Sequence, residues 1–333
     1  MFKLGTNVRN LALTSFLVFL FLSMIVSVIP ALEMQKTQPL ESMQPLDYGQ
    51  REGLKVYVKE NCMACHTQQV RSIEMDKTWG ERPSLASDYY YTKKRMDVWR
   101  QSPSLLGSER TGPDLTNIGK RQADVNWHML HLYNPRLVVK ESVMPAYPWL
   151  FTEKPSFKVE EDEIVLNIPV KYLKDKNAKI VPTQEALYLV EYLLSLKQPD
   201  LPEPDMVEFI PSSRVEKAAA GGAADAGLPD GEMLYNNTCA VCHQPGGEGL
   251  PGAFPSLLES PIVKNQDFFQ HVNVVIKGYD ANPEYGAMPP QGDLLTDEEI
   301  AAIINYEREH FGDNAPQVTA EEVKQIRDSL DAL

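Results

Sequence analysis

Cysteine is scarce in this sequence: the chain of 333 residues has four, and all four lie in two short motifs. Cys62 and Cys65 belong to "CMACH", and Cys239 and Cys242 belong to "CAVCH". No cysteine is left over for a disulfide framework. Two cysteines three positions apart on a helix also close only a small, strained loop. A structural disulfide is therefore a poor interpretation of either motif.

A histidine directly follows each cysteine pair. A zinc site needs cysteine pairs that converge on one metal, but it does not need a histidine behind each pair. A thioredoxin-like redox site needs a low-pKa thiolate beside a βαβ unit, and no such pattern surrounds either motif. Covalent haem c uses all three residues, because two thiols bind the porphyrin and the next histidine becomes the proximal iron ligand. We predict two covalently attached haem c groups, held by Cys62, Cys65 and His66 and by Cys239, Cys242 and His243.

Charge is absent from residues 11–29, which as a helix span about 28 Å, close to the thickness of a bilayer core. Lys3 and Arg9 precede this run and Glu33 follows it, which places the N-terminus in the cytoplasm. A cleaved signal peptide would normally have a shorter apolar core, of about 7–15 residues. We predict a single-pass anchor in the bacterial inner (cytoplasmic) membrane, with the haem domains on the periplasmic or outer side.

Basic residues are scarce near the end of the sequence. Residues 229–333 contain 18 acidic and 5 basic side chains, a net charge of −13, whereas residues 1–228 contain 28 and 27, a net of −1. This acidity argues against nucleic acid as a partner and against docking of this end on anionic lipid. It favours a cationic electron-donor protein as a partner. The alternative is that the acidity only keeps the domain soluble.

The segments around the two motifs repeat each other. Gly53 and Tyr57 precede the first motif, and Gly231 and Tyr235 precede the second with the same spacing. Downstream, residues 182–196 and residues 295–311 each show helical periodicity of apolar residues. Thr296 and Glu299 have the spacing of a capping box. Two terminal helices that cross beside a haem are the architecture of small cytochromes c, which both segments resemble.

The predicted fold is mainly α, with an N-terminal transmembrane helix and two cytochrome c-like haem domains. Residues 155–172 alternate in polarity, which predicts a short hairpin within the first domain, and residues 319–333 predict a short amphipathic helix. The stretch between the domains is rich in Pro, Ala and Gly and predicts a linker. The predicted parts are an anchor (1–32), a first cytochrome c domain (33–198), a linker (199–228) and a second cytochrome c domain (229–333).

An electron carrier needs iron that is closed on both sides, and a methionine thioether provides the second ligand. Met288 and Met144 each lie in a loop directly before a proline, and we predict them as the distal ligands. The predicted iron ligands are therefore His66 with Met144 and His243 with Met288.

Other side chains compete weakly for the distal position. Met75, Met96 and Met129 lack the loop context of the two predicted ligands. His128 and His131 offer a bis-histidine alternative, but both would approach one iron from one helix. Hydrogen bonding near the haem edge or to the backbone is the preferred interpretation of these two histidines.

Several residues are predicted to support the haems without ligating iron. Pro113 and Pro255 stand where a backbone carbonyl would orient the proximal imidazole. Arg71, Arg110 and Arg136 are candidates for pairing with haem propionates, because arginine suits bidentate contact with carboxylates. Each of these arginines could equally be a solvated surface residue.

The first domain resembles a narrower family in the blocks "REGLKVYVKENCMACHTQQVR", "ERTGPDLTNIGKR" and "WHMLHLYNPRLVVKESVMPAYPWL". These blocks and the single anchor are similar to the membrane-anchored mono-haem subunit (subunit II) of cbb3-type haem-copper oxidases. The resemblance covers about residues 45–150 and implies that Cys62, Cys65 and His66 hold a haem with Met144 as distal ligand. Residues 229–333 are similar only to class I cytochromes c in general.

The resemblance predicts a di-haem electron-transfer subunit that passes electrons from a periplasmic donor to the catalytic membrane subunit of an oxygen-reducing oxidase. It is not itself predicted to be the catalytic subunit. One alternative is the cytochrome c subunit of a nitric oxide reductase, which is built alike. Another is a di-haem peroxidase, which needs one iron that can open, so two methionine ligands argue against it.

Overall fold

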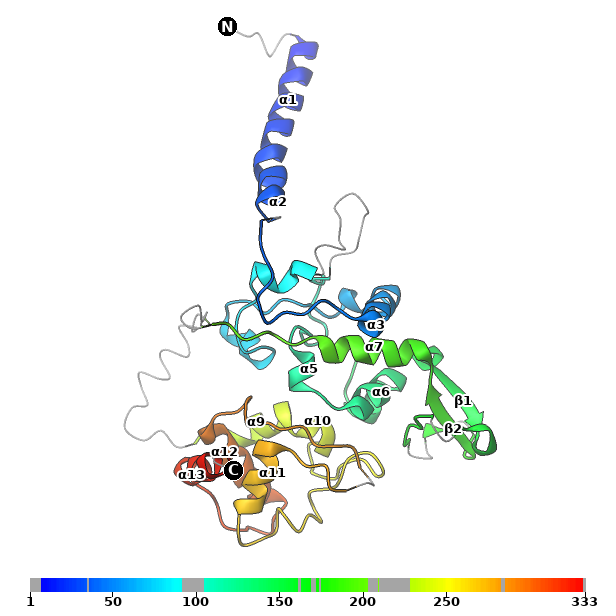
Figure 1. The fold of residues 1–333 in the computed structure, drawn as a ribbon, viewed down its shortest axis with the longest axis vertical. Coiled ribbons are helices and arrows are strands. Elements are labelled where there is room, and N and C mark those ends of the chain that lie inside the picture. The colour runs from blue at the N-terminus through cyan, green and yellow to red at the C-terminus, as the bar shows by residue number, and fades with distance from the viewer. Residues whose placement is uncertain are drawn as a thin grey trace. The chain divides into compact units, whose positions relative to one another are not determined.

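The computed structural model of this chain is shown in Figure 1. It describes residues 7–34, 36–91, 105–160, 163–168, 172–173, 175–202, 209, 228–282 and 285–331. Lys3, Met96 and most of the predicted linker lie outside the described residues. The chain divides into two compact units, which are treated separately: residues 1–45, 84–104 and 199–207 form one, and residues 46–83, 105–198 and 208–333 form the other.

The N-terminal helix consists of α1 (Val8–Ser23), a π-helical turn (Met24–Val28) and α2 (Ile29–Met34). The side chain of Asn7 caps it by accepting a hydrogen bond from the backbone nitrogen of Arg9, at 3.1 Å. The span Val8–Glu33 has a mean hydropathy of 2.5 and buries none of its side chains in the rest of the protein. By length and composition it is able to cross a membrane, as the sequence predicts.

We call residues 46–83 and 105–198 the N-terminal lobe. Its helices are α3 (Tyr48–Lys59), α5 (Ile118–Arg121), α6 (Val125–Tyr133) and α7 (Gln184–Ser195), and its strands are β1 (Phe151–Pro155) and β2 (Ala178–Pro182). Short 3-10 turns connect them at Cys62–Ala64, Glu74–Thr78, Pro135–Leu137, Pro148–Leu150 and Ser156–Lys158. One further turn, Ala86–Tyr89, belongs to the other unit.

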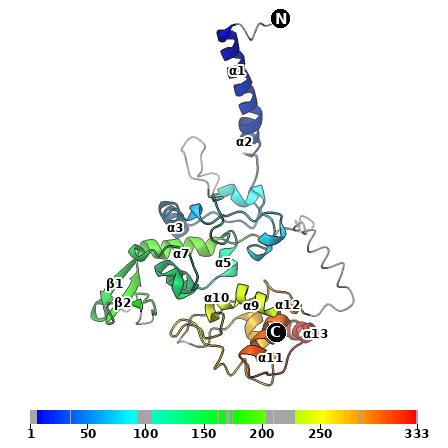
Figure 2. The ribbon, with the colours of Figure 1, turned by 180° about the vertical axis from the view of Figure 1, so that it is seen from behind.

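Helices α3 and α7 cross at a glycine, and Figures 1 and 2 show the two helices side by side. A Cβ atom on Gly53 would overlap the backbone carbonyl of Tyr188, so only glycine permits this close approach. One turn further along α3, the ring of Tyr57 packs on that of Tyr192 with centroids 5.4 Å apart. Both tyrosines are fully buried. The predicted pair of crossing helices is confirmed for this lobe.

The two strands of the hairpin in the N-terminal lobe lie further apart in the sequence than predicted. Strand β1 pairs antiparallel with β2, from Phe151 opposite Pro182 to Pro155 opposite Ala178. Within the predicted segment 155–172, Leu166 forms an isolated bridge to Ile180. The predicted position of the strands was therefore wrong. The segment with alternating polarity forms most of the connection between β1 and β2.

We call residues 228–331 the C-terminal lobe. Its helices are α9 (Gly231–Thr238), α10 (Ala240–His243), α11 (Phe269–Lys277), α12 (Asp297–His310) and α13 (Ala320–Asp331). The predicted capping box is confirmed: Thr296 Oγ1 accepts from the Glu299 backbone and the Glu299 carboxylate accepts from the Thr296 backbone. A Cβ on Gly231 would overlap the carbonyl of Ala302, so α9 crosses α12 as α3 crosses α7.

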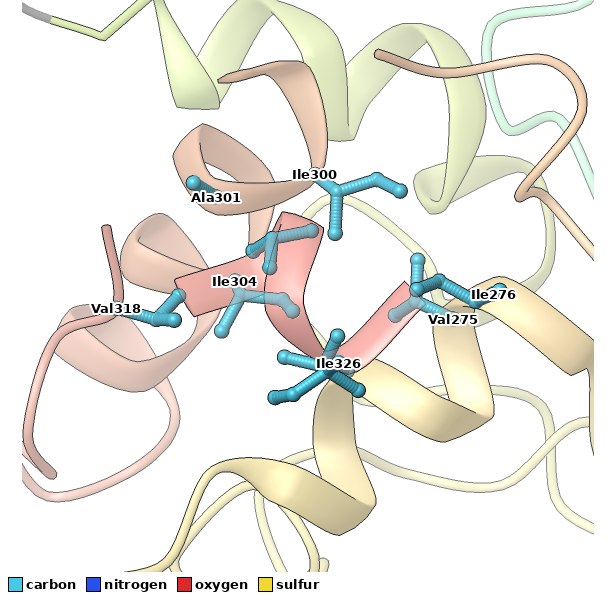
Figure 3. Packing of buried hydrophobic residues seen from close by; sticks show 9 residues of the cluster. Val275, Ile276, Ile300, Ala301, Ile304, Val318 and Ile326 are labelled. Atoms are coloured by element: carbon cyan, nitrogen blue, oxygen red, sulfur yellow. The ribbon is translucent and has the colours of Figure 1, made fainter. Parts of the chain in front are cut away.

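Helix α13 completes the apolar core of the C-terminal lobe. Figure 3 shows Ile326 from α13 close to Val275 and Ile276 from α11 and to Ile304 from α12, with Ile300 from α12 above them. Ile300 and Ile304 are fully buried. The amphipathic helix that the sequence predicts therefore covers α11 and α12 with its apolar face.

Candidate haem sites

The first cysteine motif starts where α3 ends. The helix stops at Lys59, and Asn61 adopts a left-handed backbone conformation (φ 57°) that turns the chain into the Cys62–Ala64 turn. His66 then lies against the loop 105–113. Its Nδ1 is 2.8 Å from the carbonyl oxygen of Pro113.

The second motif has the same arrangement on a different local structure. Here Cys242 and His243 lie in α10, a short helix that directly follows α9. The Nδ1 atom of His243 is 3.0 Å from the carbonyl oxygen of Pro255. The structure therefore brings Pro113 and Pro255 to the two histidines as the sequence predicts.

These two hydrogen bonds determine the tautomer of each imidazole ring. A carbonyl oxygen only accepts, so Nδ1 must carry the proton and Nε2 keeps its lone pair. Burial lowers the pKa of His66, which also favours the neutral ring that metal ligation requires. Each histidine is thus oriented and in the correct tautomer to offer Nε2 to an iron atom.

The four cysteines are free thiols. Burial raises the pKa of Cys62 and of Cys242 to about 12, and it raises the pKa of Cys239 well above its ordinary value. A redox-active or zinc-binding cysteine needs the opposite shift. Among the described residues, no three His, Cys, Asp or Glu side chains are grouped to hold a metal ion. The residues fit covalent haem better than either thiolate chemistry.

Two glycines allow the loop 105–113 to approach His66 closely. A Cβ on Gly112 would collide with the imidazole ring, and Gly107 (φ 85°) approaches the His66 backbone equally closely. The loop therefore lies tightly along the motif, and larger residues at these positions would push the histidine out of place.

The two predicted distal methionines are half-buried and lie in loops held by backbone hydrogen bonds. The amide of Met144 donates to Ser142 Oγ at 3.3 Å, and Met288 exchanges two backbone hydrogen bonds with Tyr279, at 2.8 and 3.0 Å. Of the competitors, Met75 is exposed and Met129 is fully buried in α6. The assignment of Met144 and Met288 as iron ligands stays a prediction.

The three candidate arginines have partners within the protein. Arg71 and Arg110 both form ion pairs with the fully buried Asp76, at 3.0 and 2.8 Å. Burial alone would raise the pKa of Asp76, but hydrogen bonds from Arg71 and the charge of Arg110 lower it. Arg136 donates to the backbone carbonyl of Met144 at 3.3 Å. Pairing of these arginines with propionates stays a prediction. Nothing in the sequence pattern indicates Asp76 as the partner of Arg71 and Arg110.

Helix α6 carries the two histidines of the bis-histidine alternative. His128 Nε2 is 2.8 Å from the backbone carbonyl oxygen of Gln122. This contact agrees with the preferred interpretation of His128, hydrogen bonding to the backbone. Burial lowers the pKa of His128 to about 4. Burial lowers the pKa of His131 to about 3, with further contributions from His128 and His66. The ring of His131 stacks on Trp127, with centroids 4.5 Å apart.

Comparison with known proteins agrees with this geometry. The family described as "Cytochrome C oxidase, mono-heme subunit/FixO" matches residues 3–193, and "Cytochrome C oxidase, cbb3-type, subunit III" matches residues 226–306. The two matches define a c-type cytochrome with one N-terminal helix that is able to cross a membrane. More particularly, it belongs to the mono-haem subunit family of cbb3-type cytochrome c oxidases, since that match covers more than half of its length.

Curated relatives match shorter stretches. The cytochrome c subunit of alcohol dehydrogenase (quinone) from Gluconobacter oxydans is 34% identical over 113 residues, which cover 32% of this chain and 23% of the relative. Cytochrome c-552 from Thermus thermophilus is 37% identical over 121 residues, covering 32% of this chain and 80% of the relative. The chain spans about a quarter to a third of the length of the alcohol dehydrogenase subunits that it matches.

Proposed function

We propose that this chain is the di-haem electron-transfer subunit of a cbb3-type oxidase. It accepts electrons from a cationic donor at the C-terminal lobe and delivers them from the N-terminal lobe to the catalytic membrane subunit. Both lobes lie on the periplasmic or outer side of the membrane. In this proposal the chain consists of an anchor (1–32), two haem domains (33–198 and 229–333) and a linker (199–228).

One observation carries the proposal: the same histidine–proline arrangement occurs twice in a chain whose two parts match two different subunits of one oxidase type. A mono-haem subunit would have one such arrangement. The fusion supports a chain that performs the electron relay of two oxidase subunits.

The protein holds, orients and shields each cofactor. The two cysteines of each motif would form the thioether bonds, and the Pro113 and Pro255 carbonyls would keep the proximal rings of His66 and His243 in one orientation. When bound, haem supplies a one-electron couple between ferric and ferrous iron. Met144 and Met288 would close the distal side, which keeps oxygen and peroxide away and raises the potential.

The closed distal side distinguishes this function from a di-haem peroxidase, in which one iron must open. The mono-haem oxidase match over residues 3–193 likewise favours an oxidase over a nitric oxide reductase.

The test is to purify the full chain from membranes and measure its intact mass and its copurifying subunits. We expect a mass that exceeds the polypeptide by two haems, together with a partner that contains haem b and copper. A partner with haem b and non-haem iron but no copper would indicate a nitric oxide reductase instead. A mass with one haem or none would overturn the di-haem assignment.

A further inference from the structure

The two lobes belong to one compact unit, and helix α6 makes one of the contacts between them. Trp127 on α6 donates from its indole Nε1 to the backbone carbonyl of Val241, at 3.0 Å. Val241 lies between Cys239 and Cys242 in the second motif. Trp127 is only 9% exposed, so this hydrogen bond lies in a buried environment.

Two further contacts flank this hydrogen bond. Gln122 Nε2 is 3.8 Å from Cys242 Sγ, and Gln244 Nε2 donates to the carbonyl of Val138 at 3.1 Å. Both partners on the C-terminal lobe are therefore in the second motif or directly behind it. None of these three contacts is an ion pair, so salt should not release them.

Trp127 also contacts a histidine of its own helix. Its ring lies nearly parallel to that of His131, with an interplanar angle of 10°. Contacts thus run from Val241 in the second motif through Trp127 to His131 on the same helix.

We propose that helix α6 is the docking site for the second cysteine motif, and that Trp127 is the positioning residue that holds the two haem sites close enough for direct electron transfer. This inference rests on the proposed function, because it assigns the route between the two lobes. The rate of electron transfer falls steeply with the separation of the redox centres, so a loss of docking should slow it. The potentials of the two haems should not change.

The test compares Trp127→Ala and Trp127→Phe with the wild-type full chain in detergent. Trp127→Phe keeps an aromatic ring on His131 but lacks the indole N–H. Trp149→Phe is the matched control, because Trp149 is 58% exposed and donates to Glu60 within its own lobe. A photoreductant attached through Lys324→Cys, an exposed position on α13, delivers an electron to the C-terminal lobe.

For Trp127→Ala we expect amide hydrogen exchange to rise about tenfold in residues 125–133 and 239–244, the factor that one lost hydrogen bond produces. Electron transfer between the lobes should slow by about tenfold or more, with both potentials unchanged. Trp127→Phe should lie between Trp127→Ala and the wild type, and Trp149→Phe should match the wild type. Because Trp127→Ala could destabilise the lobe, Gln244→Asn provides an independent variant, whose shorter side chain cannot reach Val138.

Wild-type exchange and transfer rates in both Trp127→Ala and Gln244→Asn would overturn the inference. Faster exchange with an unchanged transfer rate would overturn the electron route. These readouts need no oxidase. A chain that copurifies with no oxidase but shows the expected effects would therefore refute the proposed function and leave the docking intact.

Discussion

His128 shows how one buried side chain makes stability depend on pH. Because burial lowers its pKa to about 4, the folded protein keeps the ring neutral where the unfolded chain would protonate it near pH 6.5. The stability contributed by the neutral ring is complete above pH 6.5 and is lost as the pH falls toward 4. Between pH 7 and pH 5 the loss from this residue should be about 2 kcal/mol.

Denaturant unfolding of the haem-loaded protein at the two pH values checks this prediction. His128→Gln cannot be protonated and should lose correspondingly less stability between pH 7 and pH 5 than the wild type. The exposed His310→Gln is the control and should behave like the wild type. Equal pH dependence in His128→Gln and the wild type would show that His128 is not the titrating group.

At the residue scale, the sequence predicts the backbone carbonyl that contacts each of the two motif histidines. The cysteine–histidine motifs and the two prolines are local in sequence or recur in both lobes, so they leave a readable pattern. Asp76 and Trp127 leave none. The partners of Asp76 include Arg110, which is far along the chain, and Trp127 contacts a backbone carbonyl, which any residue could supply.

Among the elements, the crossing of α3 and α7 depends on Gly53. In the interior of an exposed helix, replacement of glycine by alanine stabilises by about 1 kcal/mol. Here the new methyl group would overlap the backbone carbonyl of Tyr188, which cannot move without shifting α7. We therefore expect Gly53→Ala to destabilise the protein by about 2 kcal/mol, as measured by the free energy of unfolding.

Gly49 on the same helix provides the matched control. A Cβ there meets only the carboxylate end of Glu191, which is flexible and can move aside. Gly49→Ala should be neutral or slightly stabilising. If both variants were equally stable, the crossing would not depend on glycine at position 53.

Elements with strong periodicity were predicted well, and the hairpin was not. Helix α7 follows from its apolar spacing, and α12 follows from its apolar spacing and its capping box. Strands β1 and β2, in contrast, are each five residues long and lie more than twenty residues apart. A strand pairing over that distance is decided by tertiary packing, for which short segments carry little local signal.

For the whole molecule, charge is the most uneven property. The C-terminal lobe carries most of the net charge of −14, and three of its five basic side chains are already paired with acidic ones. These ion pairs are Lys264–Asp313, Lys277–Asp331 and Arg327–Asp297. Such a field accelerates encounter with a cationic donor more than it tightens binding.

Stopped-flow reduction by a small cationic redox protein measures this effect. We expect the second-order rate to fall steeply as the ionic strength rises toward 0.1 M, where the screening length is about 10 Å. Deletion of residues 229–333 should flatten that dependence. A rate indifferent to salt, or a truncated chain reduced just as fast, would mean that the acidity serves only solubility.

Helix α13 lies beyond the residues that match the subunit III family, but it belongs to the folded core of the C-terminal lobe. The match to the oxidase subunit III family ends at residue 306, within α12, yet the apolar cluster in Figure 3 includes Val318, Val323 and Ile326 from beyond that point. A gene segment that encoded only the matched residues would leave Ile300 and Ile304 without the cover that Val318, Val323 and Ile326 provide. The portion that recombination could move intact into another protein therefore has to reach the end of α13.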